Sequence, residues 1–99
     1  MKLGFIGFGE VGFEMDTGFK GEGLEGILAY DVMRGHPQFG ALLQERVAKS
    51  GVTLVTAPED VLSQVDVVIV AVPGDKALET AKGLKKGLKA GLLYVDVSA

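Results

Sequence analysis

A chain of 99 residues is long enough for one domain with a hydrophobic core and too short for two. Its composition, 47% hydrophobic and 23% charged with a formal net charge of −3, is typical of a globular protein and gives no electrostatic reason to expect nucleic acid or an anionic membrane as a partner. The lack of cysteine excludes disulfides and thiolate metal sites, and no apolar run reaches the length of about 18 residues that a bilayer requires.

The first predicted element is an apolar strand over residues 2–6, which leads directly into the turn Gly-Phe-Gly-Glu-Val-Gly at 7–12. A G-x-G-x-x-G turn between a buried strand and a helix is typical of dinucleotide binding. We expect Gly7 to form the tight turn, Gly9 to let the backbone approach a pyrophosphate, and Gly12 to let the helix pack closely on the strand. The helix N-terminus, with a charge of about +0.5, then favours phosphate without a lysine. The competing interpretation is a glycine-rich turn that binds nothing.

The first strand begins almost at residue 1 and leaves no room for a signal sequence, so we expect a cytoplasmic location. The helix after the turn is predicted over residues 10–22. Interior glycines such as Gly18 each cost about 1 kcal/mol relative to alanine, so an early break there is an alternative. We expect burial of Phe13, Phe19 and Leu24 to compensate.

A second strand, over residues 26–30, ends at Asp31, nineteen residues beyond Gly12. An acidic residue at about this offset accepts hydrogen bonds from the adenosine ribose. Asp31 favours NAD, because a 2′-phosphate about 4 Å away costs roughly 4 kcal/mol at a dielectric constant near 20. Arg34 can pair with that phosphate, so NADP stays open. The carboxylate of Glu10 would oppose a pyrophosphate unless it turns into solvent, and we expect that it does.

Helices and strands continue to alternate to the end of the chain. Apolar residues at helical spacing (Phe39, Leu42, Leu43, Val47) predict a second helix, followed by a strand over 52–55. Thr56 and Glu59 have the spacing of a capping box, with Pro58 in the first turn of a short helix. The strongest strand signal is the β-branched run over 66–72.

The last predicted helix carries Leu78, Ala81, Leu84 and Leu88 at helical spacing. We expect Asp75 to cap it and Gly91 to end it, before a strand over 92–97. Its lysines (Lys76, Lys82, Lys85, Lys86, Lys89) indicate a solvated helix face.

Right-handed crossovers between these elements predict an α/β fold, a doubly wound parallel sheet of the Rossmann type with five strands in the order 3-2-1-4-5. The ligand crevice should lie at the carboxyl ends of strands 1 and 4. The last strand should present an apolar edge that a further part of the protein covers.

Residues 5–15, 71–73 and 90–98 resemble the N-terminal cofactor domain of the β-hydroxyacid dehydrogenases, which include 6-phosphogluconate dehydrogenase and 3-hydroxyisobutyrate dehydrogenase. The resemblance implies that residues 1–99 are the NAD(P)-binding domain of an oxidoreductase that oxidises a hydroxy acid, or reduces the oxo acid, by hydride transfer. It also implies a fragment: the substrate would bind between this domain and a helical C-terminal domain that the 99 residues lack. The full-length protein is then expected to be a homo-oligomer.

Site residues follow from the resemblance position by position. The implied cofactor-binding residues are Gly7, Phe8, Gly9, Glu10, Val11, Gly12, Asp31, Arg34, Ala71, Val72 and Pro73. Ser98 belongs to an Asp-x-Ser motif and would contact the substrate carboxylate, or it is simply a turn former. The family's catalytic lysine lies on a later helix, so we expect no catalytic residue, no metal ligand and no activity in these residues alone. His36 is expected at the surface.

Two alternatives keep the nicotinamide cofactor. Similar domains occur in prephenate dehydrogenase and glycerol-3-phosphate dehydrogenase, and only the sequence beyond the domain separates them. A domain that senses NAD without chemistry, as in regulated ion transporters, has the same turn.

Overall fold

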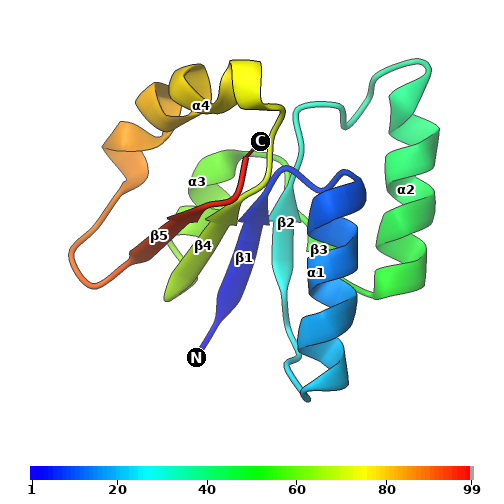
Figure 1. Cartoon of the computed structure of the whole chain (residues 1–99), viewed down its shortest axis with the longest axis horizontal. Helices are drawn as coiled ribbons and strands as arrows, with labels where there is room; N and C mark the ends of the chain where they lie inside the picture. The colour runs from blue at the N-terminus through cyan, green and yellow to red at the C-terminus, as the bar shows by residue number, and fades with distance from the viewer. Residues whose placement is uncertain (99) are drawn as a thin grey trace.

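The computed structural model describes residues 1–98 as a parallel sheet with helices on both faces (Figure 1). The sheet has the order β3-β2-β1-β4-β5, as predicted, and all four neighbouring pairs are parallel. The strands are β1 Leu3–Ile6, β2 Leu28–Tyr30, β3 Thr53–Leu54, β4 Val67–Val70 and β5 Leu93–Asp96. The helices are α1 Glu10–Gly21, α2 Phe39–Ser50, α3 Pro58–Leu62 and α4 Ala77–Leu84, with 3₁₀ turns at Gly74–Lys76 and Lys85–Gly87.

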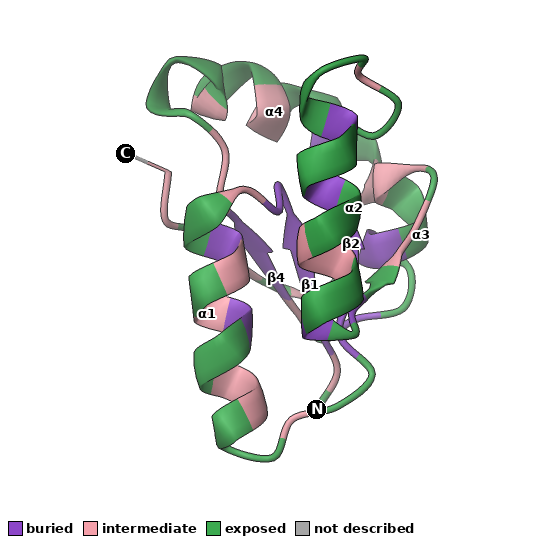
Figure 2. Cartoon of the chain, turned by 90° about the vertical axis from the view of Figure 1, so that its right-hand side faces the viewer, coloured by how far each residue is buried: buried purple, intermediate pink, exposed green. Residues whose placement is uncertain are grey.

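The core has two layers, one on each side of the sheet (Figure 2). Along β4 the side chains alternate: Ile69 joins the cluster beneath α1 and α2, while Val68 and Val70 join the cluster beneath α3 and α4. All three are at most 3% exposed. Because helices cover both faces, this central strand is apolar at every position instead of alternating with polar residues.

Every predicted strand is longer than the observed one. The last predicted strand, over residues 92–97, is observed as Leu93–Asp96, for example. Single hydrogen bonds extend the pairing past the ladder, such as Val97 N–H to the Val70 carbonyl at 3.0 Å and Val55 N–H to the Ala29 carbonyl at 2.8 Å. The predicted runs therefore overestimate the strands at their ends: Gly26 has φ +69° and Asp66 lies in a bend, so neither residue continues the extended backbone.

The first helix runs without a break through Gly18 to Gly21. Phe13, Phe19 and Leu24 pack against the cluster beneath α1 and α2, as predicted, and the Phe19 ring lies 6.4 Å from that of Phe5. Tertiary burial thus outweighs the low helix propensity of the glycines.

The predicted caps of α3 and α4 are wrong. In α3 the N-cap is Ala57, and Thr56 instead places its hydroxyl 3.4 Å from the Asp60 carboxylate, because the helix begins one residue later than the capping box requires. Asp75 lies inside the 3₁₀ turn that precedes α4, and no side chain caps that helix.

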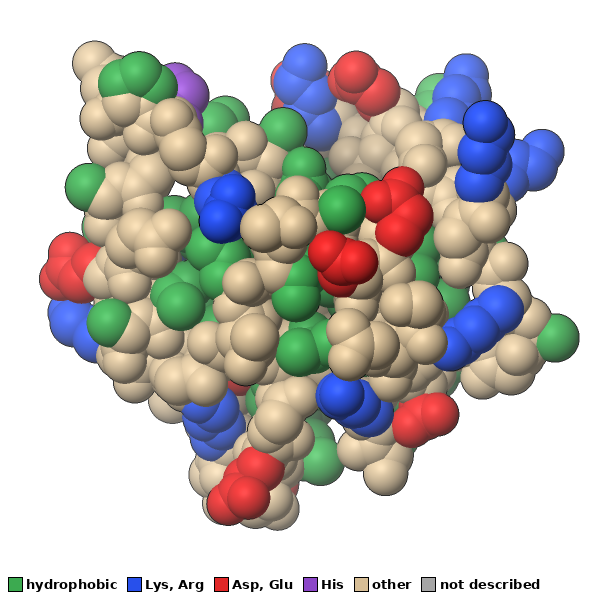
Figure 3. Space-filling model, turned by 180° about the vertical axis from the view of Figure 1, so that it is seen from behind, with side chains coloured by type: hydrophobic (Ala, Val, Ile, Leu, Met, Phe, Trp, Pro, Cys, Tyr) green, Lys and Arg blue, Asp and Glu red, His purple; other side chains and the backbone are tan. Residues whose placement is uncertain are grey.

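The end of α4 also differs from the prediction. The α-helix stops at Leu84, and Leu88 is exposed beyond the following 3₁₀ turn. Gly91, with φ +87°, forms the turn into β5 rather than the helix end. The predicted lysine-rich surface is exposed along α4 and the turn after it, where basic side chains gather in Figure 3, so it is a solvated face.

Asp16 is a buried carboxylate in the middle of α1, with no exposed surface. Neither of its oxygens accepts a hydrogen bond, and the nearest cation, Lys20 Nζ, is 3.9 Å away. Burial raises the pKa of Asp16 above its ordinary value of 3.8, and the charge of Lys20 offsets this in part. In the folded protein the proton is therefore held to higher pH than in the unfolded chain.

Asp16→Ala is expected to stabilise the domain at pH 7, by about 1–3 kcal/mol, because it removes a buried carboxyl group without hydrogen-bond partners and with only a distant cation. Because the pKa of Asp16 is higher in the folded than in the unfolded protein, protonation of this carboxyl group favours the folded state. This stabilisation is fully present below pH 3.8 and is lost as the pH rises from 3.8 through the folded-state pKa. The advantage of the variant should therefore shrink towards pH 4. Urea unfolding between pH 4 and pH 8 measures it, with the exposed Glu14→Ala on the same helix as the control. A destabilised variant at pH 7 would contradict the expectation.

Candidate dinucleotide-binding site

The turn between β1 and α1 needs glycine at two positions for the fold itself. Gly7 has φ +91°, and a Cβ there would collide with the carbonyl oxygen of Ala71. A Cβ on Gly12 would lie 2.8 Å from the Gly7 carbonyl oxygen. Gly9 differs, because its φ is −76° and, apart from its two chain neighbours, no residue has an atom within 4 Å of a Cβ placed on it. The absence of a side chain at Gly9 therefore leaves open space that the fold itself does not use.

Backbone donors surround that space. Within residues 1–98, the N–H groups of Gly9, Glu10 and Val11 donate no hydrogen bond to protein. They lie at the start of α1, where the helix dipole adds about half a positive charge. Glu10 is exposed, as expected for a carboxylate that turns into solvent, and Val11 is 54% exposed. The arrangement suits an anion such as a pyrophosphate.

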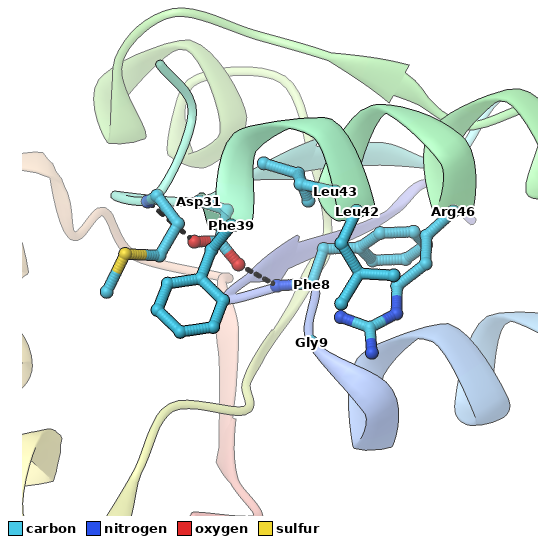
Figure 4. A pocket seen from close by; sticks show the side chains of 8 residues that line it. Phe8, Gly9, Asp31, Phe39, Leu42, Leu43 and Arg46 are labelled. Atoms are coloured by element: carbon cyan, nitrogen blue, oxygen red, sulfur yellow. Dashed lines mark hydrogen bonds between the residues drawn. The ribbon is translucent and has the colours of Figure 1, made fainter. Parts of the chain in front are cut away.

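Asp31 is held beside the turn by two backbone donors. Its Oδ2 accepts the Phe8 N–H at 2.7 Å and its Oδ1 accepts the Met33 N–H at 2.8 Å (Figure 4). An ionised carboxylate has about four acceptor positions, so each oxygen keeps capacity for a ribose hydroxyl. The carboxylate is thus fixed in place before any ligand arrives.

A hollow of about 230 Å³ opens between the turn and α2 (Figure 4). Its lining residues are Phe8, Gly9, Asp31, Met33, Phe39, Leu42, Leu43 and Arg46. The last five were not predicted as site residues from the sequence, where Phe39 and Leu42 indicated only the apolar face of a helix. Phe39 is 52% exposed and Leu42 is 42% exposed, because their part of α2 overhangs the turn instead of the core. The signal was present: Arg46 follows Phe39 by seven residues and so shares its helix face.

Two charged or titratable residues of the β2–α2 loop lie apart from this hollow's lining. Arg34 is exposed and forms no ion pair within residues 1–98. His36 is partly buried, and its Nδ1 accepts the N–H groups of Gln38 at 3.0 Å and Phe39 at 3.1 Å. His36 therefore satisfies two backbone N–H groups at the start of α2, a role that was not predicted from the sequence.

On the β4 side, Ala71 and Val72 are half-buried and Pro73 is exposed. The Ser98 hydroxyl accepts the Val72 N–H at 3.1 Å and donates to the Val70 carbonyl at 3.3 Å. Ser98 thus joins the carboxyl ends of β4 and β5, and its proton is engaged within the protein. Its contact with a substrate stays a prediction. No group of three His, Asp or Glu side chains suited to a metal occurs within residues 1–98.

A comparison with protein families covers almost the whole chain. Residues 2–99 match the model of the family described as NADP oxidoreductase, coenzyme F420-dependent. The chain belongs to this family. It is accordingly an NAD(P)-binding domain of the oxidoreductase type, which the sequence analysis predicted at that level. None of the curated proteins matches the chain.

Solved structures share the fold of this family domain. A conserved hypothetical protein from Sinorhizobium meliloti is 26% identical, with a TM-score of 0.86 over 99% of this chain and 32% of its own. A 3-hydroxyisobutyrate dehydrogenase from Mycobacterium tuberculosis is 21% identical, with a TM-score of 0.77 over 98% of this chain and 31% of its own. A pyrroline-5-carboxylate reductase from Coxiella burnetii is 21% identical, with a TM-score of 0.80 over 98% of this chain and 35% of its own. The chain therefore spans about a third of the length of these proteins.

None of the helices within residues 1–98 has the length and hydropathy of a membrane span.

Proposed function

We propose that the chain is the cofactor domain of a nicotinamide-dependent dehydrogenase that interconverts a hydroxy acid and its oxo acid. The observation that carries this proposal is the combination of open space at Gly9 with the Asp31 carboxylate fixed beside it. A pyrophosphate needs the first feature, and an adenosine ribose needs the second. The substrate class rests on the resemblance of the segments at 5–15, 71–73 and 90–98 to the β-hydroxyacid dehydrogenases.

The residues present fit such a cofactor from end to end. The free N–H groups of Gly9, Glu10 and Val11 would bind the pyrophosphate, and Asp31 would orient the ribose. The backbone after β4, from Ala71 onward, would line the nicotinamide side. The bound nicotinamide supplies the hydride acceptor or donor. The proton transfer would depend on a residue outside this domain.

NAD is the preferred cofactor in this proposal, because Asp31 stands where a 2′-phosphate would meet a negative charge. Two further parts follow the same family resemblance: another domain that completes the substrate site, and a homo-oligomeric full-length protein. The proposal also includes a cytoplasmic location.

Calorimetric titration of the protein with NAD and NADP tests the cofactor role, and no binding of either at millimolar concentration would overturn it. Hydride transfer, followed by the absorbance of the reduced cofactor, tests the reaction in the full-length protein with a set of 3-hydroxy acids. Turnover supports the hydroxy-acid dehydrogenase. Binding of NAD without turnover of any 3-hydroxy acid, prephenate or glycerol 3-phosphate would favour the NAD-sensing alternative instead.

A further inference from the structure

Arg46 is a cation at the candidate site that has no role in the proposed function. It lies on α2, is partly buried, and extends towards the turn at Gly9, beside the Phe8 ring (Figure 4). Within residues 1–98 no carboxylate oxygen lies within 4.0 Å of its guanidinium nitrogens. An arginine that lines a hollow, without a carboxylate partner for its guanidinium, is suited to an anionic ligand.

The position of the hollow indicates which part of a dinucleotide would reach Arg46. The start of α1 takes the pyrophosphate and Asp31 takes the ribose hydroxyls, under the proposed function. The hollow adjoins both, through Gly9 and Asp31, and continues beyond them to α2. Because Asp31 and Arg46 line the same hollow, a substituent on the oxygen of a ribose bound at Asp31 would have this space open to it.

The charges are consistent with a phosphate in that place. Asp31 alone would repel it, but both carboxylate oxygens already accept backbone N–H groups, which partly offset the negative charge. Arg46 then supplies a full positive charge across the hollow. Arg34, the cation that the sequence offered for this role, is exposed in the loop and does not line the hollow.

We propose that Arg46 binds the 2′-phosphate of NADP and so determines how well the domain accepts NADP besides NAD. This inference rests on the proposed function, since it assumes that the turn and Asp31 hold a dinucleotide. It assigns cofactor choice to a residue of α2 rather than to the loop directly after β2.

Calorimetric titration of wild type, Arg46→Ala, Arg46→Lys and Arg34→Ala with NAD and NADP tests the proposal. Loss of a charge-assisted contact is expected to raise the Kd for NADP about tenfold or more in Arg46→Ala, with the Kd for NAD changed by less than about twofold. Arg46→Lys should keep part of the NADP affinity, because it keeps the charge without the planar fork. Arg34→Ala should change neither Kd. Lys49→Ala, exposed on the same helix, controls for the loss of a positive charge.

A second pair of probes isolates the adenosine half. Adenosine 2′,5′-bisphosphate should lose affinity for Arg46→Ala, and AMP should not. Equal losses for NAD and NADP would overturn the proposal, because Arg46 would then contact a part that the two cofactors share. A wild type that binds NAD but not NADP would overturn it while leaving the proposed function intact. A wild type that binds neither would overturn both.

Discussion

Gly7→Ala is expected to destabilise the domain by about 2–6 kcal/mol, which is a large part of the free energy of unfolding of a domain of this size. The alanine must adopt φ +91°, and its methyl group would collide with the carbonyl oxygen of Ala71. Ala71 is held in place, because its N–H donates a 2.9 Å hydrogen bond to the Ile6 carbonyl. The two nearest atoms, O and C of Ala71, belong to the backbone and cannot move aside as the end of a flexible side chain can. Chemical denaturation followed by circular dichroism measures the change.

The matched control for that substitution is Gly18→Ala. Gly18 lies in α1 with negative φ, and no atom outside its own stretch of helix backbone lies within 4 Å of a Cβ placed on it. Alanine should stabilise the helix there by about 0.5–1 kcal/mol. If Gly7→Ala were as stable as the wild type, this result would contradict the close approach of the turn to the end of β4.

Gly9→Ala is expected to have the opposite profile, with stability within about 0.5 kcal/mol of wild type and cofactor affinity reduced about tenfold or more. The protein has room for the methyl group, since no atom lies within 4 Å of it. The methyl group would occupy the space through which a pyrophosphate approaches the N–H groups at the start of α1. Calorimetry with NAD and NADP measures the loss, which should be similar for both.

Gly83→Ala is the control for Gly9→Ala, because Gly83 also has open space around it and lies in α4, away from the turn. It should leave both affinities unchanged. Unaltered cofactor binding by Gly9→Ala would mean that phosphate does not approach the backbone at this turn, and the proposed function would lose its main support.

The fold was accessible from the sequence because its signals are local. The β-branched run of β4 indicates a strand covered on both faces, and the alternation of strands and helices limits the sheet to few topologies. The predicted helix caps at Thr56 and Asp75 are not formed, because a local signal does not fix the exact residue at which a helix begins. Thr56 and Asp75 have suitable types and spacing, but a shift of one or two residues in the helix start, decided by packing, removes the cap.

For the candidate site, the sequence alone determined the turn at residues 7–12 and its partner Asp31, because glycine geometry and the spacing along one β-α-β unit place them together. Only the tertiary structure decided that Ser98 joins β4 to β5 and that Arg46 faces Gly9 across a hollow. Periodicity assigns Phe39, Leu42 and Arg46 to one helix face. Whether that face meets the core or an open turn depends on how α2 lies against α1, a contact between segments far apart in the chain.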